Sequence, residues 1–432
     1  MQPHWTKSPD ASQKTAHILL AVSERGRGLI VLFAAAAVAG IYLGLARKDP
    51  AAGGSAPPGP SQSAEAPSIR APRVPTRAEA EALSKRLGQA VRADAGDPKS
   101  PWALAHGMVA FGPDFAASDG RAARDVIVSF AEPRTAGAKK VWLFPESKQG
   151  SPVEPHRFIL VKTLLEMNVP LDQSFATSSG EKVTLARLVA DLRTAAAAPK
   201  TDSDYHHVAW QISALAEHVR RVPAAAGQEP KLPELIADAL ARLEADQKVV
   251  EGYGGPPEKA FDDGSPLNAA KREKKGIYGH SCGGMHLVQA VASAIAAARR
   301  DEDERRFRKQ LGVLLYRYEL ERPAYAALLL RHPGQGLLIR LQQQKFFGHL
   351  VETLTLAKSL GLTAPETEGG KRIDQTIRYA TGDLVDVSKE LLDGGVYDRL
   401  DAVRKDREQT YLDLIGDGCH ALRGLGRAVE LL

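Results

Sequence analysis

The sequence predicts a nearly all-α fold, and three observations carry this prediction. Aromatic residues make up only 6% of the chain, while alanine and leucine are abundant. Because Ala and Leu favour helices and strands prefer β-branched and aromatic residues, this composition favours helices. Apolar residues recur at helical spacing from Thr76 onward, and strand-like segments are too few and short for a sheet-based fold.

The N-terminal region predicts a membrane anchor. Residues 1–27 form a short tail, and residues 28–46 read GLIVLFAAAAVAGIYLGLA without a charge. About 19 helical residues match the roughly 30 Å hydrocarbon core of a bilayer, so we expect one transmembrane helix. Arg25 and Arg27 precede it, a slight bias that favours the N-terminus on the cytoplasmic side.

The segment after the anchor predicts a tether. Residues 47–75 are mostly Pro, Ala, Gly and Ser and cannot bury enough apolar surface to fold, so we expect a disordered stalk. Residues 76–432 would then form a periplasmic or extracellular helical domain of a single-pass protein of the cytoplasmic, or inner, membrane. The expected partners are the membrane, through residues 28–46, and a cell-envelope polymer or envelope protein. A signal peptide cleaved after Ala46 is the alternative.

Helices are predicted along the whole domain. Thr76 and Glu79 form a capping box, in which a hydroxyl and a carboxylate satisfy free amide groups of a first helical turn. Helical periodicity predicts helices at 77–92, 101–111, 121–131, 157–167, 184–192, 205–220, 233–250, 282–299, 302–321, 323–331, 337–360, 373–392, 396–407 and 409–432. Strand-like pieces occur at 126–130, 141–144 and 182–184.

Histidine and cysteine recur in a common context. Several predicted helices open with His or Cys beside small residues and continue as apolar stretches. This pattern is expected if alternate helices of helical hairpins form an inner ring with their N-termini at one end. Residues 101–432 thereby resemble α/α-toroid proteins such as lanthionine-synthetase-like proteins, terpene cyclases and polysaccharide lyases. The resemblance implies an α/α-toroid-like array of helical hairpins behind the transmembrane helix. The segments that carry the pattern are 102–107, 206–210, 280–286, 347–350 and 418–422.

The two cysteines predict a zinc site. Cys282 and Cys419 each neighbour histidines, and two Cys with one His leave the fourth position of a catalytic zinc open. We therefore predict Cys282, Cys419 and His420 as zinc ligands. Their Cys-Gly-Gly and Cys-His-Ala contexts are similar to the Cys-x-Gly and Cys-His-Gly zinc motifs of lanthionine-synthetase-like proteins. Ala421 departs from that pattern, the tryptophan before the first cysteine is missing, and the cysteines lie further apart. A disulfide and two buried free thiols are the alternatives.

A serine nucleophile is a second interpretation. Residues 279–283 fit the G-x-S-x-G pattern of a nucleophile elbow, with Ser281 as nucleophile and His420 downstream. That motif requires a buried strand before it, and the charged segment 271–275 stands there instead. Ser281 also suits a helix N-cap.

Acid/base catalysis by histidines is a third interpretation. Histidine moves protons near neutral pH, and helix N-termini would lower its pKa. His280, His286 and His349 are the leading catalytic candidates beside Ser281. The wider set also contains His106, His207, His420, Tyr205 and Tyr278.

Function remains open between two classes. The net charge of +5 is small and spread over the chain, so no nucleic-acid partner is expected. An enzyme acting on a cell-envelope molecule would gather the His and Cys side chains around an open pocket. A non-catalytic scaffold or binding protein would leave them scattered.

Overall fold

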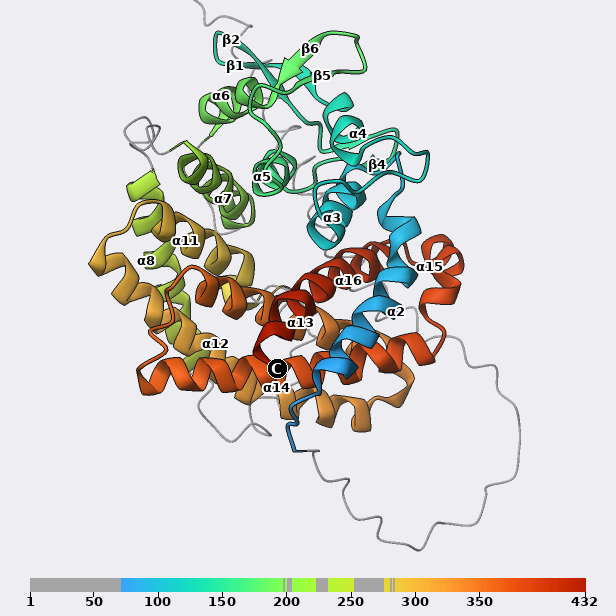
Figure 1. The fold of residues 1–432 in the computed structure, drawn as a ribbon, viewed down its shortest axis with the longest axis vertical. Coiled ribbons are helices and arrows are strands. Elements are labelled where there is room, and N and C mark those ends of the chain that lie inside the picture. The colour runs from blue at the N-terminus through green and yellow to red at the C-terminus, as the bar shows by residue number, and fades with distance from the viewer. Residues whose placement is uncertain are drawn as a thin grey trace, which may run out of the picture. The chain divides into compact units, whose positions relative to one another are not determined.

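The computed structural model describes residues 71–196, 199, 204–222, 232–251, 276–279, 282 and 284–432. These residues are mostly helical (Figure 1), so the prediction of a nearly all-α fold is confirmed. The predicted tail and anchor, most of the stalk, and His280 and Ser281 lie outside the described residues. Within the described part of the chain, no helix has both the length and the apolar character needed to cross a membrane.

The first two helices begin where the sequence predicted. Thr76 Oγ1 accepts a hydrogen bond from the amide of Glu79 at 3.2 Å, and the Glu79 carboxylate accepts one from the amide of Thr76 at 2.7 Å. This capping box starts α2 (Arg77–Ala95). Ser100 caps α3 (Pro101–Phe111), with proline in the first turn, where a missing N–H costs nothing.

The other helices cover most of the predicted segments. They are α4 (Ala123–Ser129), α5 (Ile159–Glu166), α6 (Leu185–Ala195), α7 (Tyr205–Arg221), α8 (Leu232–Glu251), α11 (Met285–Ala297), α12 (Asp301–Arg331), α13 (Gly336–Ser359), α14 (Glu368–Asp393), α15 (Leu400–Asp406) and α16 (Glu408–Ala428).

In the described part of the chain, short strands pair as three two-stranded antiparallel sheets. The strand-like segments predicted at 141–144 and 182–184 are confirmed in β2 and β6, whereas the one at 126–130 is wrong, because these residues belong almost entirely to helix α4. The strands are β1 (Glu132–Ala136), β2 (Lys139–Leu143), β3 (Ser147–Lys148), β4 (Ser151–Pro152), β5 (Ser174–Ala176) and β6 (Lys182–Thr184).

Helix α12 joins two segments that the sequence predicted as separate helices. Pro323 lies inside it, although proline lacks the N–H of the helical hydrogen bond and clashes with the preceding turn. The turns that follow bury Ala324, Tyr325 and Leu328. Burial of this apolar face therefore outweighs the local cost of the proline.

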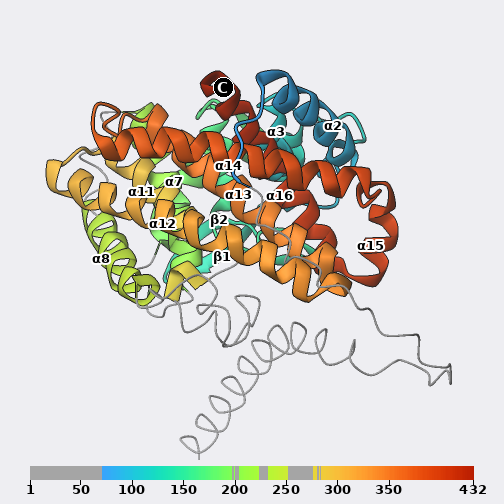
Figure 2. The same ribbon diagram turned by 90° about the horizontal axis from the view of Figure 1, so that it is seen from below.

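Six helices contact one another in a closed circuit (Figure 1). Each of α3, α5, α7, α11, α13 and α16 contacts the next, and α16 contacts α3 again. The remaining long helices pack against members of this circuit. The helix α14 lies along α13, α2 packs on α16, and α8 and α12 pack on α11 (Figure 2).

Two glycines allow α13 and α16 to approach closely. A Cβ atom on Gly348 would lie 3.3 Å from the backbone of Ala421, and one on Gly424 would lie 3.1 Å from the carbonyl oxygen of Gly348. The two backbones are therefore in direct contact at these positions. Side chains on the neighbouring residues then reach easily from one helix to the other.

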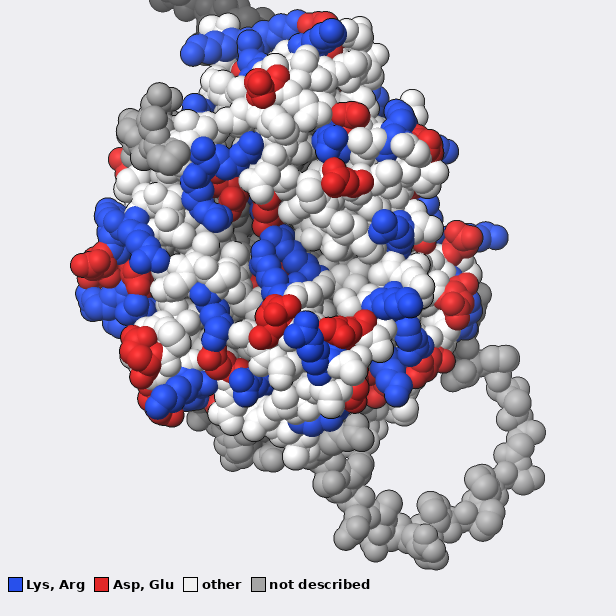
Figure 3. All heavy atoms as spheres, in the orientation of Figure 1, with Lys and Arg blue, Asp and Glu red and all other residues white. Residues whose placement is uncertain are grey.

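Charged side chains on the surface are interleaved. On the face drawn in Figure 3, lysines and arginines alternate with aspartates and glutamates. Exposed ion pairs such as Arg86–Asp393, 2.7 Å apart, and Arg372–Glu319, 2.9 Å apart, follow this arrangement. The small net charge of the chain is thus distributed over the surface rather than gathered in one patch of this face.

The contact between α13 and α16 predicts a difference between two glycine substitutions. Gly424→Ala should lower the free energy of unfolding by about 1–3 kcal/mol relative to Gly426→Ala, the usual cost of overpacking a core. Both variants gain the same helix propensity, but a Cβ on Gly426 meets nothing within 4 Å. Chemical denaturation of the two variants measures the difference. Equal stabilities would mean that the two helices separate without cost.

Candidate functional site

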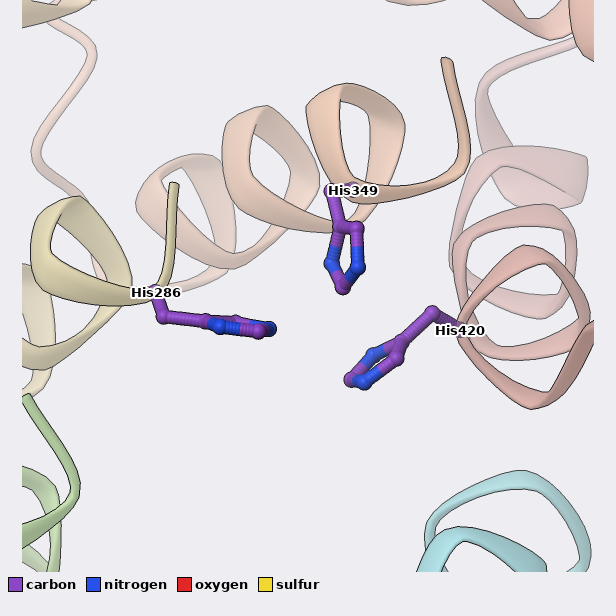
Figure 4. A group of neighbouring side chains, drawn as sticks. All are labelled: His286, His349 and His420. Carbon is purple, nitrogen blue, oxygen red and sulfur yellow. The ribbon is translucent and has the colours of Figure 1, made fainter. Parts of the chain in front are cut away.

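Three histidines from the closed circuit of helices meet in one place (Figure 4). They are His286 of α11, His349 of α13 and His420 of α16. One ring nitrogen of each lies within 4.8 Å of those of the other two. The ring centroids of His349 and His420 are 4.2 Å apart, and those of His286 and His349 are 4.6 Å apart. These side chains lie close enough to bind a metal ion.

The three imidazoles line a cavity of about 490 Å³. Cavities of this size accommodate small molecules. Its apolar lining residues are Trp102, Pro152, Pro155, Ile159, Trp210 and Leu412. Its other polar lining residues are His106, His156, Cys282, Lys345, Gln409, Asp413 and Asp417.

Two rows of side chains face each other across the contact between α13 and α16. Residues spaced by four and then three positions lie on one face of a helix. The α13 row consists of Lys345, His349 and Glu352, and the α16 row of Asp413, Asp417 and His420.

Lysine and histidine side chains of one row pair with carboxylates of the other row. The Lys345 Nζ atom lies 3.1 Å from Asp413 Oδ1 and 3.3 Å from Asp417 Oδ2. The His349 Nε2 atom lies 3.6 Å from Asp417 Oδ1. The His420 Nδ1 atom lies 2.8 Å from the Oε2 atom of Glu352. Each of these histidines therefore meets a carboxylate that the other helix supplies.

Each of the three imidazoles has a ring nitrogen without a hydrogen-bond partner among the described residues. An ionised carboxylate only accepts hydrogen bonds, so His420 donates from Nδ1 to Glu352 and its Nε2 carries a lone pair. The Nε2 atom of His286 and the Nδ1 atom of His349 are buried without a hydrogen-bond partner. Buried polar atoms nearly always have a partner. Imidazole nitrogens suit zinc, copper, iron and nickel, so these residues fit a divalent transition metal.

Burial controls the protonation of the histidines around the cavity. Burial lowers the pKa of His106 to about 3 and that of His156 to about 4. Burial also lowers the pKa values of His286 and His420, which keeps both rings in the neutral form that binds metal. Burial opposes a charge on His349 as well, but the carboxylates of Asp417 and Glu352, 3.6 and 3.7 Å from its ring nitrogens, outweigh burial and raise its pKa.

The positions of the histidines differ from those predicted. His286 lies in the first turn of α11, as expected, but His349 and His420 lie well inside α13 and α16. The prediction that helix N-termini would lower the pKa values is therefore wrong for these two residues. The macrodipole acts only within the first turn, and burial has the larger effect here.

A chain of buried ion pairs, Lys162–Glu166–Arg423–Glu352, holds the carboxylate beside His420. The Arg423 guanidinium lies 3.4 Å from Glu352 and also donates to Glu166, which accepts from Lys162 at 2.6 Å. Burial opposes the charge on Glu352, but His420, His349 and Arg423 hold its pKa well below the ordinary range. Glu352 is therefore ionised and fixed in place.

The predicted zinc ligands do not come together. Cys282 lines the cavity, whereas Cys419 is buried and is absent from the cavity lining. Consecutive residues of a helix point about 100° apart, so Cys419 and its neighbour His420 face different surroundings. Both thiols are free, so the alternative of a disulfide does not hold. Among the described residues, His420 joins His286 and His349 instead.

The other candidates occupy varied positions. His106 lines the cavity, and the half-buried His207 accepts a hydrogen bond from the Arg157 amide at 3.1 Å. Residues Gly276–Gly279 form a 3-10 helix, so the strand that a nucleophile elbow at Ser281 requires is not present there. Tyr278 donates to Gln310 in the core.

The sequence contained an overlooked signal for part of the site. Glu352 follows His349 by three positions, and Asp417 precedes His420 by three, so both helices place a carboxylate and an imidazole on one face. Lys345 continues the first row by one helical turn. His156 lies in an irregular segment, where periodicity carries no signal.

Comparisons with protein-family models, curated proteins and solved structures gave no match. The fold and the site define a helical protein with a buried three-histidine centre on the wall of a cavity.

One wall of the cavity depends on a buried carboxyl group. The segment 152–159 supplies four lining residues, and Glu154 within it accepts a hydrogen bond from the Leu160 amide at 3.1 Å. This contact satisfies the first turn of α5, which follows Phe158 in a left-handed conformation. Burial raises the pKa of Glu154 to about 8.

The raised pKa of Glu154 predicts a pH-dependent stability. Between its ordinary value of 4.5 and about 8, the carboxyl group holds its proton in the folded chain and loses it in the unfolded chain. Its contribution is therefore fully present below the lower value and lost as pH rises through the upper one. Glu154→Gln keeps the acceptor oxygen and should remove this loss.

Denaturation midpoints measured between about pH 5 and pH 8 test this expectation. Glu146→Gln, at an exposed position that precedes the segment 152–159, is the matched control and should keep the wild-type slope. An unchanged slope in Glu154→Gln would contradict the assignment.

Proposed function

We propose that this chain is a metal-dependent enzyme in which His286, His349 and His420 hold a zinc ion. The observation that carries the proposal is the convergence of three imidazoles on the wall of a cavity. Structural zinc sites are closed by four protein ligands, whereas catalytic sites use three and leave a position open. A three-histidine set beside a cavity matches the second arrangement.

The surrounding residues suit hydrolytic or lyase chemistry. When bound, zinc supplies an electrophile and an activated water at neutral pH. Glu352 orients His420 through Nδ1, and Asp417 lies beside His349, as carboxylates do behind zinc-binding histidines. His106 and His156 line the same cavity in neutral form. A neutral imidazole within reach of the reacting group accepts a proton.

The alternative is a non-catalytic scaffold or binding protein. Scattered histidines would favour that alternative, whereas His286, His349 and His420 gather at one cavity. Each of the two rows also places ionisable groups in the interior, where unpaired charges are costly. Buried ion pairs can also fix the packing of a scaffold, so it is the convergence of the three imidazoles on a cavity that favours catalysis.

The same proposal covers the architecture and the location. We infer an α/α-toroid-like array, and the closed circuit of α3, α5, α7, α11, α13 and α16 supports it. The uncharged stretch 28–46 and the Pro-rich segment after it support a tether that holds the domain outside the cytoplasm. The substrate would then be a molecule of the cell envelope.

Metal analysis tests the three-histidine centre. The purified full-length chain, loaded with Zn²⁺ and freed of excess, should retain about one zinc per chain. His286→Ala, His349→Ala and His420→Ala should each lose most of it, because two imidazoles bind zinc weakly. His332→Ala, at an exposed position, is the control. Elemental analysis measures the zinc content, and circular dichroism shows whether each variant is folded. A zinc content equal to that of the wild-type chain in all three folded variants would overturn the proposal.

The hydrogen bond of Glu352 to His420 predicts that loss of this carboxylate weakens zinc binding without abolishing it. Glu352→Gln should weaken zinc affinity about 10–100-fold, the usual effect of losing a carboxylate behind a zinc-binding histidine. Competition with a chromophoric chelator measures the affinity. Glu390→Gln, which removes an exposed partner of Arg340, should leave it unchanged. Wild-type affinity in a folded Glu352→Gln variant would assign Glu352 to core stability alone.

A further inference from the structure

The charged side chains that line the cavity carry one negative charge in excess. One cation and two carboxylates belong to this lining, namely Lys345, Asp413 and Asp417. Lys345 lies 3.1 Å from Asp413 and 3.3 Å from Asp417, so its single charge compensates only one of the two carboxylates. Behind the lining, Glu352 and Glu166 are paired with Arg423 and Lys162.

A divalent cation would reverse this imbalance. A metal ion binds the unprotonated form of each histidine, so the charged lining would change from one net negative charge to one net positive charge. Charges in a protein interior require compensation because desolvation is costly. The loaded site therefore matches one additional negative charge, and the cavity is the place where a ligand can supply it.

Lys345 is placed to contact such a ligand. It lines the cavity, its side chain is only 9% exposed, and it lies one helical turn before His349 on the same face of α13. Asp417 contacts both of these residues. An ammonium group has three N–H donors, so the contacts to Asp413 and Asp417 leave one for a ligand.

Apolar side chains make up much of the rest of the lining. Trp102 belongs to α3, Pro152 and Pro155 to the segment before α5, and Trp210 to α7, whereas the charged residues belong to α13 and α16. The charged side chains thus come from α13 and α16, and the elements opposite supply apolar side chains together with the neutral imidazoles of His106 and His156. A volume of about 490 Å³ suits a small molecule, whose apolar part gains free energy by burial.

We propose that the cavity binds a small molecule with a single carboxylate group and an apolar body. One carboxylate oxygen would bind at the open metal position, and the other would accept a hydrogen bond from Lys345. The body would pack against Trp102, Trp210 and the two prolines. This inference rests on the proposed function, since the metal supplies the excess positive charge. A neutral ligand leaves that charge uncompensated, and a dianion overcompensates it.

Cobalt-loaded full-length protein tests the ligand class, because the visible absorption of Co²⁺ changes with its ligands. Benzoate is the probe; benzamide has the same size without the charge, and acetate has the charge without the apolar body. Benzoate should change the spectrum saturably and bind at least about tenfold more tightly than either. Equal binding of benzamide and benzoate, or no response to benzoate, would overturn the inference.

Variants of Lys345 test the contact itself. Lys345→Met should weaken benzoate binding about tenfold or more, and Lys345→Arg should retain most of it, while both still bind Co²⁺. Lys371→Met, at an exposed position, is the control. Wild-type benzoate affinity in folded Lys345→Met would remove Lys345 from the site. If Lys345→Met does not fold, the comparison of benzoate with benzamide on the wild-type chain still decides. Failure of the wild-type chain to bind Co²⁺ would instead refute the metal centre.

Discussion

The close contact between α13 and α16 determines the geometry of the site. Gly348 and Gly424 bring the backbones together, and only then do the two rows of side chains meet. Side chains on one helix face move as a unit, because the helix is a stiff cylinder with a fixed rise per residue. A shift or rotation of either helix would therefore disturb the Lys345–Asp417 and His420–Glu352 pairs at the same time. The α13–α16 contact therefore sets the positions of His349 and His420, and the packing of α11 on α13 adds His286.

Electrostatics explains why the site tolerates so many polar groups in the interior. Every carboxylate of the two rows faces a cation or an imidazole of the opposite helix, and Arg423 links Glu352 to Glu166 of α5. Such pairs add little net stability, since desolvation offsets their attraction. These pairs instead fix the orientation of the side chains, because most other arrangements of the two helices would leave a buried charge unpaired. The unpartnered nitrogens of His286 and His349 are then exceptions that a bound cation would remove.

Periodicity and caps predicted most of the fold, because these are local properties. The capping box at Thr76 and the helix from Pro101 to Phe111 required no tertiary information. Pro323 misled the prediction, since burial of neighbouring turns decided its helix. The sequence also identified His286, His349 and His420 as candidates in separate roles. Their meeting was not predictable, because the contact of His420 with Glu352 spans 68 residues and depends on the rotation of whole helices. Because consecutive residues of a helix point in different directions, His420 lines the cavity and Cys419 does not.

The long separations within the site also bear on how the chain reaches its native state. The contact of Arg423 with Glu166 joins residues 257 positions apart, and closing so long a loop costs more entropy than closing a helical turn. The three imidazoles also come from helices that are far apart along the chain. An ion that binds only the native state stabilises it by mass action. Because α16 carries His420, separation of α16 from α13 would break the metal site, so a bound ion would hold the two helices together.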